Sequence, residues 1–257
     1  MHFSRERREQ ILKLLEENQT VQVADLAQRF NVSEVTIRRD LNQLRQHRGI
    51  ERVYGGAILT QREREQPPLS NREVIHSNAK RWIGRAAAEL VEPGDTIIIG
   101  GGTTTVELAR NLVNAEDLVV IAPALNIAAM LAESPGVTLL VTGGILVGPE
   151  LTLAGHFGEQ MLASLNADKL FIGSCAFDPE TGVTSAHISE IGINQAMFRS
   201  GTQRILLVDH SKFNQIAPYT FGDTEQLDCV VTDSQVPPEA LDALEKRGVQ
   251  VIQAGPQ

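Results

Sequence analysis

The sequence predicts an α/β domain with a mostly parallel sheet and helices on both faces, preceded by a small domain of three helices and a hairpin. From about Asn71 onward, short apolar strands alternate with helical patterns, which is typical of parallel sheets. Residues 1–58 instead carry three helical patterns in succession. A polar segment that contains two prolines separates these parts, so we expect two domains.

The composition excludes several classes of protein. A chain of 257 residues with 42% apolar side chains can bury a sizeable core. Its two cysteines, Cys175 and Cys229, are too few for a disulfide framework, and no cysteine or histidine cluster has metal-ligand spacing. The apolar runs are far shorter than the ~20 residues of a membrane helix, and residues 1–10 lack the apolar stretch of a signal peptide. We therefore expect a cytoplasmic protein without a metal, a cofactor or a membrane partner.

The net charge of −9 is distributed unevenly along the chain. Residues 1–58 contain ten basic and eight acidic side chains, a balance of +2, which leaves −11 for the rest. Residues 61–68 are polar and end in two prolines, which cannot continue a helix. We predict a domain over residues 1–58, a linker over 59–72 and a second domain over 73–257.

The small domain is expected to begin with a helix over about residues 5–17, where apolar side chains recur at helical spacing. A second, shorter helix is expected after Thr20. Residues 31–33 form a tight turn, and Ser33 is a suitable N-cap for a third helix from Glu34 to about His47. The apolar residues that share one face of this third helix are Ile37, Leu41 and Leu44.

A short hairpin is expected to complete this domain. Residues 50–54 alternate between apolar and polar side chains, and residues 55–59 supply a glycine turn and a return strand. Two short helices joined by a tight turn, the second with a basic outer face, fit a winged helix-turn-helix whose last helix enters the major groove of DNA. The alternative is a helical bundle whose arginines are only solvated, and the spacing leaves both readings open.

The third helix and the hairpin resemble a known family. Val32-Ser33-Glu34-Val35-Thr36-Ile37-Arg38-Arg39-Asp40-Leu41 resembles the recognition-helix signature of the DeoR family of bacterial transcriptional regulators. Residues 49–57 are similar to the wing of that family, with its spaced glycine, arginine and Gly-Gly-Ala. The resemblance continues through Asp209-His210-Ser211-Lys212-Phe213 and covers nearly the whole chain. It implies binding to double-stranded operator DNA.

Physical roles follow for single side chains of the motif. The first turns of a recognition helix approach the floor of the groove, so we expect Ser33, Thr36 and Arg39 to reach base edges or phosphates. Arg38 and Arg52 are expected to contact phosphates. The candidate DNA-binding residues, with the two wing glycines, are Ser33, Thr36, Arg38, Arg39, Arg52, Gly55 and Gly56. Asp40 is expected to pair with a neighbouring arginine.

The second domain is expected to be an open sheet, in which ligands bind beyond the carboxyl ends of the strands. The expected strands cover residues 96–99, 118–121, 137–141, 170–172, 205–208, 229–232 and 249–252. The expected helices include residues 104–112, 125–132, 188–199 and 237–247.

Residues 99–107 satisfy this rule, because a strand runs here into a turn of glycine and threonine that opens a helix. Glycine lets backbone N–H groups approach an anion, threonine hydroxyls add donors, and the helix N-terminus favours negative charge. The segment is neither a P-loop nor a GxGxxG fingerprint, so a purely structural turn is the alternative to a phosphate site. The candidate residues of this turn are Gly101, Gly102, Thr103, Thr104 and Thr105.

The family resemblance implies a ligand for this domain. The corresponding half of DeoR-type regulators is similar to sugar-phosphate isomerases and typically senses a phosphorylated sugar or a derivative. Gly102-Thr103-Thr104 matches the family's Gly-Thr-Thr, and Gly143-Gly144 matches its paired glycine. The resemblance further implies that Lys212 neutralises a phosphate and that Glu190 binds a sugar hydroxyl, with a surface ion pair as the alternative for both. Gly144, Glu190 and Lys212 thus join the candidate effector residues.

The chain departs from the family pattern at loop positions that are expected to line the ligand site. Gly100 stands where the family usually carries aspartate, and Ala122-Pro123 stands in place of Thr-Asn. Asn194 replaces a lysine, and Ala176 replaces a glycine. Small or neutral groups thus replace polar or charged ones, so either the ligand differs from that of the family or sensing has weakened.

We expect a transcriptional regulator, a repressor of a carbohydrate-metabolism operon, and no catalytic residues. A sugar-phosphate isomerase fused to a DNA-binding domain is one alternative, for which Glu190 and Lys212 would supply the base and the cation. Gly100 and Asn194 remove positions where further acid-base groups would be expected. A ligand-independent DNA-binding protein with a degenerate second domain is another alternative. Because one helix-turn-helix reads a single half-site, we expect a homodimer or homotetramer, assembled mainly through the second domain.

Overall fold

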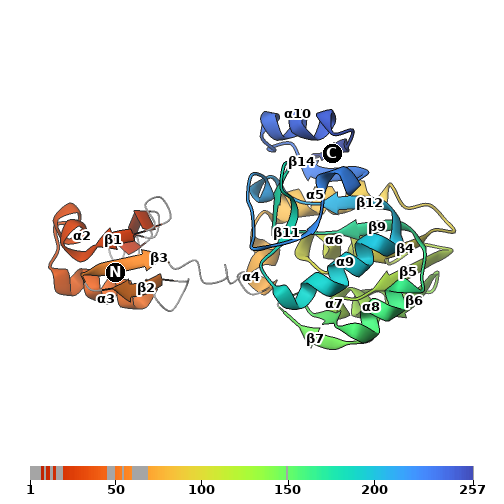
Figure 1. Ribbon diagram of the computed structural model, residues 1–257, viewed down its shortest axis with the longest axis horizontal. Helices are drawn as coiled ribbons and strands as arrows, with labels where there is room; N and C mark the ends of the chain where they lie inside the picture. Colours follow the sequence, from red (N-terminus) through yellow and green to blue (C-terminus); the bar gives the residue numbers. More distant parts are fainter. Residues whose placement is uncertain are drawn as a thin grey trace. The chain divides into compact units, whose positions relative to one another are not determined.

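The computed structural model of the chain divides into two compact units, Met1–Glu65 and Gln66–Gln257 (Figure 1). It describes residues 7–8, 10–11, 14–15, 20–44, 50–53, 55–59, 69–148 and 150–256, with the backbone alone at 20, 50–53 and 58–59. The division between the units falls within the range 59–72 that the sequence predicted as a linker. Helix α4 (Leu69–Val74) begins inside that range and belongs to the second unit.

The N-terminal unit contains the predicted helices and hairpin. Its described residues between 7 and 15 are helical, within the range expected for the first helix. Helices α2 (Val23–Arg29) and α3 (Glu34–Leu44) follow, and strands β2 (Ile50–Val53) and β3 (Gly56–Leu59) form the hairpin. The part of the third helix expected after Leu44 lies outside the described residues.

The same unit has a strand that the sequence did not predict. Strand β1 (Thr20–Gln22) pairs antiparallel with β3, so the order of this small sheet is β1-β3-β2. The helix expected after Thr20 therefore begins only at Val23, because the three preceding residues are in the sheet. One apolar core joins the helices to the sheet, and its buried members are Ile11, Leu15, Val21, Val23, Leu26, Ile37, Leu41, Leu44 and Ala57.

The C-terminal unit is built on a seven-stranded parallel sheet of order β15-β14-β12-β9-β4-β5-β6. All seven strands include residues that the sequence predicted to be extended. Their bounds are β4 (Thr96–Ile99), β5 (Leu118–Ala122), β6 (Val137–Val141), β9 (Ala167–Ile172), β12 (Gly201–Leu207), β14 (Cys229–Asp233) and β15 (Gln250–Ala254).

Helices cover both faces of this sheet, as predicted. One apolar cluster joins one face to α5 (Ser77–Ala88), α6 (Thr103–Asn111) and α7 (Leu125–Leu131). A second cluster joins the other face to α8 (His156–Ala163), α9 (Ile191–Ser200) and α10 (Pro238–Lys246). Ile98 belongs to one cluster while Ile97 and Ile99 belong to the other, because successive side chains of a strand point to opposite faces.

Smaller elements lie in the segments between the strands of the large sheet, and the sequence predicted few of them. Strands β7 (Ile145–Val147) and β8 (Thr152–Ala154) form an antiparallel arm after β6. Strands β10 (Ala176–Asp178), β11 (Gly182–Ser185) and β13 (Tyr219–Gly222) form a separate antiparallel sheet. Three 3₁₀ turns, η1 (Ile188–Glu190), η2 (His210–Lys212) and η3 (Thr224–Gln226), complete the set. Among the described helices, none has the length and apolar character that crossing a bilayer requires.

Candidate DNA-binding surface and effector site

Helix α3 presents a buried face to the core and an exposed face to solvent. Ile37, Leu41 and Leu44 are buried as the sequence predicted. Of the predicted DNA-binding residues on the opposite side, Ser33, Arg38 and Arg39 are exposed and Thr36 is half-buried. Because its apolar face packs into the core, the helix is held in place and leaves its polar face available.

Ser33 caps α3, which confirms the predicted start of the helix. The backbone N–H of Thr36 donates to Ser33 Oγ at 3.3 Å, and Ser33 Oγ lies 2.9 Å from Thr36 Oγ1. A cap of this kind is worth about 1 kcal/mol, because it satisfies one of the free N–H groups of the first turn. The two hydroxyls are thereby fixed together at the end of the helix where a contact with DNA is predicted.

The arginines of the N-terminal unit differ in their partners. Arg7 Nε donates to Asp40 Oδ2 at 2.7 Å, and both side chains are largely buried, so Asp40 pairs with an arginine 33 positions away and not with the neighbouring one that the sequence predicted. Arg38 pairs with Glu34 at 2.8 Å on the exposed surface, where such a pair contributes little. Arg39 is exposed and has no ion-pair partner among the described residues.

The wing residues have distinct structural settings. Gly55 is exposed and has a φ of 84°, a left-handed conformation that glycine adopts without strain. Gly56 is buried in β3, and a Cβ at this position would lie 2.2 Å from the carbonyl oxygen of Val21. Gly56 thus allows β1 to approach β3, a role that the sequence did not predict. Arg52 lies in β2, and its side chain is outside the described part of the chain.

The glycine and threonine turn lies where the sequence placed it, between β4 and α6. Gly102 has a φ of 140° and is the N-cap residue of α6. The three threonines of the first turn are buried, and Thr105 Oγ1 donates to the carbonyl oxygen of Gly102 at 2.9 Å. The hydroxyl of Thr105 is therefore engaged within the turn, whereas Thr103 and Thr104 form no such bond there. Gly101 lies against the arm, where a Cβ would be 2.8 Å from Thr152 Oγ1.

Two lysines lie near the carboxyl ends of the sheet strands. Lys80 of α5 is buried, and its Nζ donates to the carbonyl oxygens of Arg72 and Ile75. Burial lowers the pKa of the Lys80 ammonium; Asp209 opposes this shift, whereas Lys212 and Arg72 add to it. Lys212, in η2, is half-buried and close enough to Lys80 for electrostatic repulsion. The sequence predicted Lys212 but missed Lys80, although the apolar spacing of Ala79, Ile83 and Ala87 would have indicated α5.

The late motif that contains Lys212 is rigidly held. Asp209 is buried, and its Oδ1 accepts hydrogen bonds from the backbone N–H and the hydroxyl of Ser211. Nδ1 of His210 lies 3.0 Å from the Asp233 carboxylate, and the ring of Phe213 packs edge-on against Phe177. These contacts fix the position of the neighbouring Lys212.

A buried cluster of charges lies under the arm. Arg72 of α4 forms an ion pair with Glu150, which lies between β7 and β8, and both side chains are largely buried. Glu190 is 4% exposed, and its Oε1 has no hydrogen-bond partner among the described residues. Burial raises the pKa of Glu190 to about 7, with a further increase from Glu150 and an opposing effect of Arg72. The surface ion pair considered for Glu190 is therefore wrong, because its carboxyl is buried beside another carboxyl.

The remaining predicted positions have packing roles. Gly144 begins the arm with a φ of 142°, and a Cβ there would lie 2.5 Å from the carbonyl oxygen of Ala154. Gly100 is buried, and a Cβ there would lie 3.2 Å from Ile172 Cγ1 and 3.4 Å from Met197 Cε. The carbonyl oxygen of Pro123 accepts from the backbone N–H of Leu153 at 2.7 Å and so ties the loop after β5 to the arm.

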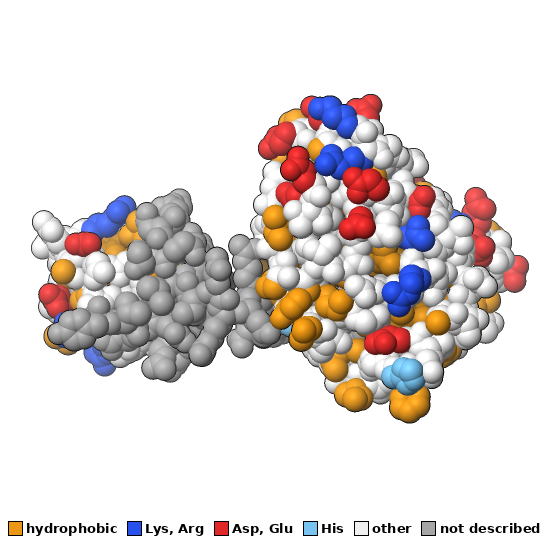
Figure 2. Space-filling view, viewed as in Figure 1, with side chains coloured by type: hydrophobic (Ala, Val, Ile, Leu, Met, Phe, Trp, Pro, Cys, Tyr) orange, Lys and Arg blue, Asp and Glu red, His pale blue; other side chains and the backbone are white. Residues whose placement is uncertain are grey.

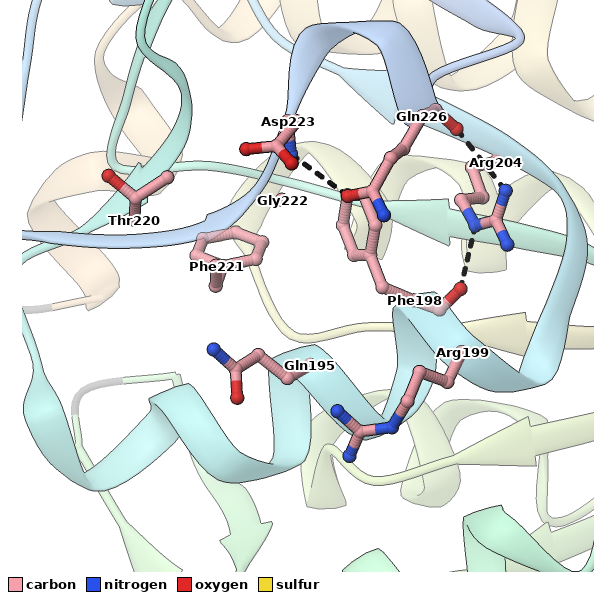
Figure 3. A pocket seen from close by; sticks show the side chains of 9 residues that line it. All are labelled: Gln195, Phe198, Arg199, Arg204, Thr220, Phe221, Gly222, Asp223 and Gln226. Carbon is pink, nitrogen blue, oxygen red and sulfur yellow. Dashed lines mark hydrogen bonds between the residues drawn. The ribbon is translucent and has the colours of Figure 1, made fainter.

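Two pockets of the C-terminal unit lie apart from the predicted effector residues. One, of about 560 Å³, lies between the end of α9 and β13 (Figure 3). Its Arg204 Nε already donates to the Phe198 carbonyl oxygen at 2.7 Å, and Asp223 and Gln226 bond to each other. A second, of about 340 Å³, lies at the start of α5 beside His210. Neither is lined by Glu190, Lys212 or the glycine and threonine turn. Within the described part of the chain, no group of acidic, histidine and cysteine side chains could hold a metal ion.

Replacing Glu190 by glutamine is expected to flatten the dependence of stability on pH. The pKa of Glu190 is raised from 4.5 to about 7 in the folded chain, so the folded state binds more protons than the unfolded state between these values. The free energy of unfolding of the unsubstituted chain should therefore fall by roughly 2–3 kcal/mol as the pH rises through this window. Denaturant titrations at both ends of the window check this, with Glu159→Gln as the control. An unchanged pH dependence in Glu190→Gln would contradict the assignment.

Two features define the class of this protein. Helix α3 has a basic, exposed face, and the α/β unit has charged loops at the carboxyl ends of its strands, which together define a DNA-binding regulator with a sensor domain. Residues 7–63 match the model of the DeoR-like helix-turn-helix domain, and residues 75–234 match that of the DeoR C terminal sensor domain. The chain belongs to the DeoR family of transcriptional regulators, as its sequence motifs indicated.

Relatives of known name match along almost their whole length. The chain is 36% identical over 252 residues to the putative aga operon transcriptional repressor of Escherichia coli O157:H7, covering 97% of this chain and 94% of that protein. It is 32% identical over 251 residues to the repressor GlcR of Bacillus subtilis, covering 97% and 96% respectively. Ribose 5-phosphate isomerase A from Methanocaldococcus jannaschii shares 16% identity with a TM-score of 0.40, over 53% of this chain and 54% of that chain. A likeness this weak assigns no activity.

Proposed function

We propose that this regulator represses a carbohydrate-metabolism operon by binding double-stranded operator DNA through α3 and its wing, as a homodimer or homotetramer. The observation that carries the proposal is the exposed Arg39, which has no described ion-pair partner and lies on a helix clamped to the core by its opposite face. Its guanidinium is thus available for the paired acceptors of a base edge or for a phosphate. The two relatives named above are called repressors, and one of them is named after an operon.

We further propose that a phosphorylated sugar or a derivative controls the binding to DNA. The first turn of α6 offers free backbone N–H groups and the positive end of a helix, which favour a phosphate. Lys80 and Lys212 add positive charge near the same carboxyl ends of the strands. Glu190 supplies a buried oxygen without a described partner, which suits a hydroxyl donor. An effector acts only if it binds the DNA-competent and DNA-incompetent states with different affinities.

Replacing Arg39 by alanine is expected to weaken operator binding by about 1–3 kcal/mol and to relax sequence preference, because a side chain that reads a base is lost. Fluorescence anisotropy with the operator and with mismatched duplexes measures both effects, once genome-wide footprinting has identified the operator. Arg199→Ala removes an exposed arginine from the other unit and controls for net charge. If the affinity falls equally for all DNA sequences, Arg39 contacts a phosphate and does not read a base. Unchanged affinity would contradict the place of Arg39 in the interface.

The proposal of an effector is tested with a panel of pentose and hexose phosphates. Thermal unfolding measures whether a compound binds, and release of operator DNA measures whether it controls binding to DNA. A ligand at about 100 times its dissociation constant should add about 2.7 kcal/mol to the free energy of unfolding. The matching compound should also release the operator. No stabilisation by any compound would favour ligand-independent binding to DNA, and turnover of a sugar phosphate would favour the isomerase.

A further inference from the structure

The two edge strands of the large sheet are protected to different degrees. At one edge, β15 carries the polar Gln250 and Gln253, and Arg85 donates to the carbonyl oxygen of Gly255 just beyond it. At the other edge, β6 has the sequence Val-Thr-Leu-Leu-Val and pairs only with β5 among the described strands. An apolar edge strand with open backbone groups is a template for pairing with another chain, and soluble proteins usually block it with charge, proline or a covering segment.

Strands β6 and β7 and the loop that joins them contain no charged residue, although the exposed Glu116 lies against Gly136 at the amino end of β6. From Leu118 to Gly148, Glu133 is the only charged residue of the sequence. Val141 at the end of β6 is 41% exposed, Ile145 of β7 is 72% exposed, and Phe157 at the start of α8 is 76% exposed. Phe157 lies against Gly143, in the loop that joins β6 to β7, so it adjoins the end of β6. Figure 2 shows hydrophobic side chains, in orange, along the lower edge of this unit over β7 and α8.

We propose that this face, defined by β6, β7 and Phe157, binds the same face of a second copy of the chain. In such a dimer a two-fold axis would relate the two β6 strands. They would pair antiparallel, so that each strand supplies hydrogen-bond partners for the open backbone groups of the other. Homodimer interfaces are more apolar than the rest of the surface, and a stable one buries about 800 Å² per partner.

Charge favours a second copy over another occupant. Outside residues 1–58 the chain has a net charge of −11, so two copies of this part repel each other on balance. The uncharged strands β6 and β7 can meet the same strands of a second copy without repulsion between like charges. The dimer also provides the two DNA-binding units that a two-fold operator needs, and in this respect alone the inference rests on the proposed function.

The test is sedimentation of the full chain and of two face variants, Thr138→Lys and Ile145→Lys, over a wide range of concentration. Thr138 is exposed in the middle of β6, and Ile145 is exposed on β7, so neither substitution removes a core contact. In a two-fold dimer each lysine would face or lie near its own copy. We expect the unsubstituted chain to be a dimer or larger, and each variant to dissociate at least about tenfold more readily.

The control is Ile216→Lys, which places a lysine at a residue that is 58% exposed and outside the face. Circular dichroism verifies that all variants are folded. A monomeric unsubstituted chain would overturn the proposal, as would an oligomer that neither face variant weakens or that Ile216→Lys weakens equally. Because sedimentation needs no DNA, failure here is distinguishable from failure of the proposed repression, which would appear as absent operator binding by the unsubstituted chain.

Discussion

Gly56→Ala is expected to destabilise the N-terminal unit by about 3 kcal/mol and to abolish operator binding. The added methyl group would lie 2.2 Å from the carbonyl oxygen of Val21, which belongs to the backbone of β1 and cannot rotate away. Relief requires β1 to separate from β3, and the two strands pair over only three residues. Because Val21 and Val23 contribute to the same core as α3, the recognition helix would lose part of its support.

Two measurements separate this packing role from the direct contact with DNA that the sequence predicted for Gly56. Unfolding of the N-terminal unit, followed by circular dichroism, should shift in Gly56→Ala, and DNA affinity should fall with it. Gly55→Asn is the matched control, because asparagine tolerates the left-handed conformation of this exposed turn and should leave stability nearly unchanged. Normal stability of Gly56→Ala with reduced DNA affinity would instead restore Gly56 as a contact residue.

Arg72→Met is expected to destabilise the C-terminal unit by about 3–5 kcal/mol at neutral pH, because it leaves a buried carboxylate without its cation. Glu150 would lose its ion-pair partner, and Glu190, whose pKa is already raised to about 7 by burial and by Glu150, would lose the opposing charge. Without Arg72 the pKa of Glu190 should rise further, because Arg72 opposes the shift. Carboxyls with a raised pKa in the folded state lower stability as the pH increases through that pKa, so the deficit should be smaller in mild acid.

Denaturant unfolding at mildly acidic and neutral pH checks both the size and the sign of this effect. Arg81→Met, at an exposed arginine of α5, is the matched control and should cost little. The double variant Arg72→Met, Glu150→Met should recover much of the loss, because a buried pair replaced by apolar side chains is often neutral. A small, pH-independent effect of Arg72→Met would contradict the buried cluster.

The strands of the large sheet were predictable because each contains a short apolar run. Both β4 and β6 have the bounds that the sequence predicted, and the central β4 shows why, since buried parallel strands need apolar side chains on both faces. The arm β7–β8 and the sheet of β10, β11 and β13 were not predicted, because strands of three or four residues at loop positions show too little alternation. Strand β1 was missed for a related reason, since its three residues adjoin the helical pattern of α2.

The sequence by itself determined the features that depend on neighbouring residues. The Ser33 cap, the two faces of α3 and the glycine and threonine turn before α6 all follow from residues within a few positions of one another. Only the tertiary structure decided which charges are buried together. Arg72 and Glu150 are 78 positions apart, and Glu190 reaches them from a third segment. Burial and pairing of charges depend on distance in space, so the raised pKa of Glu190 and the packing role of Gly56 arise only when distant segments meet.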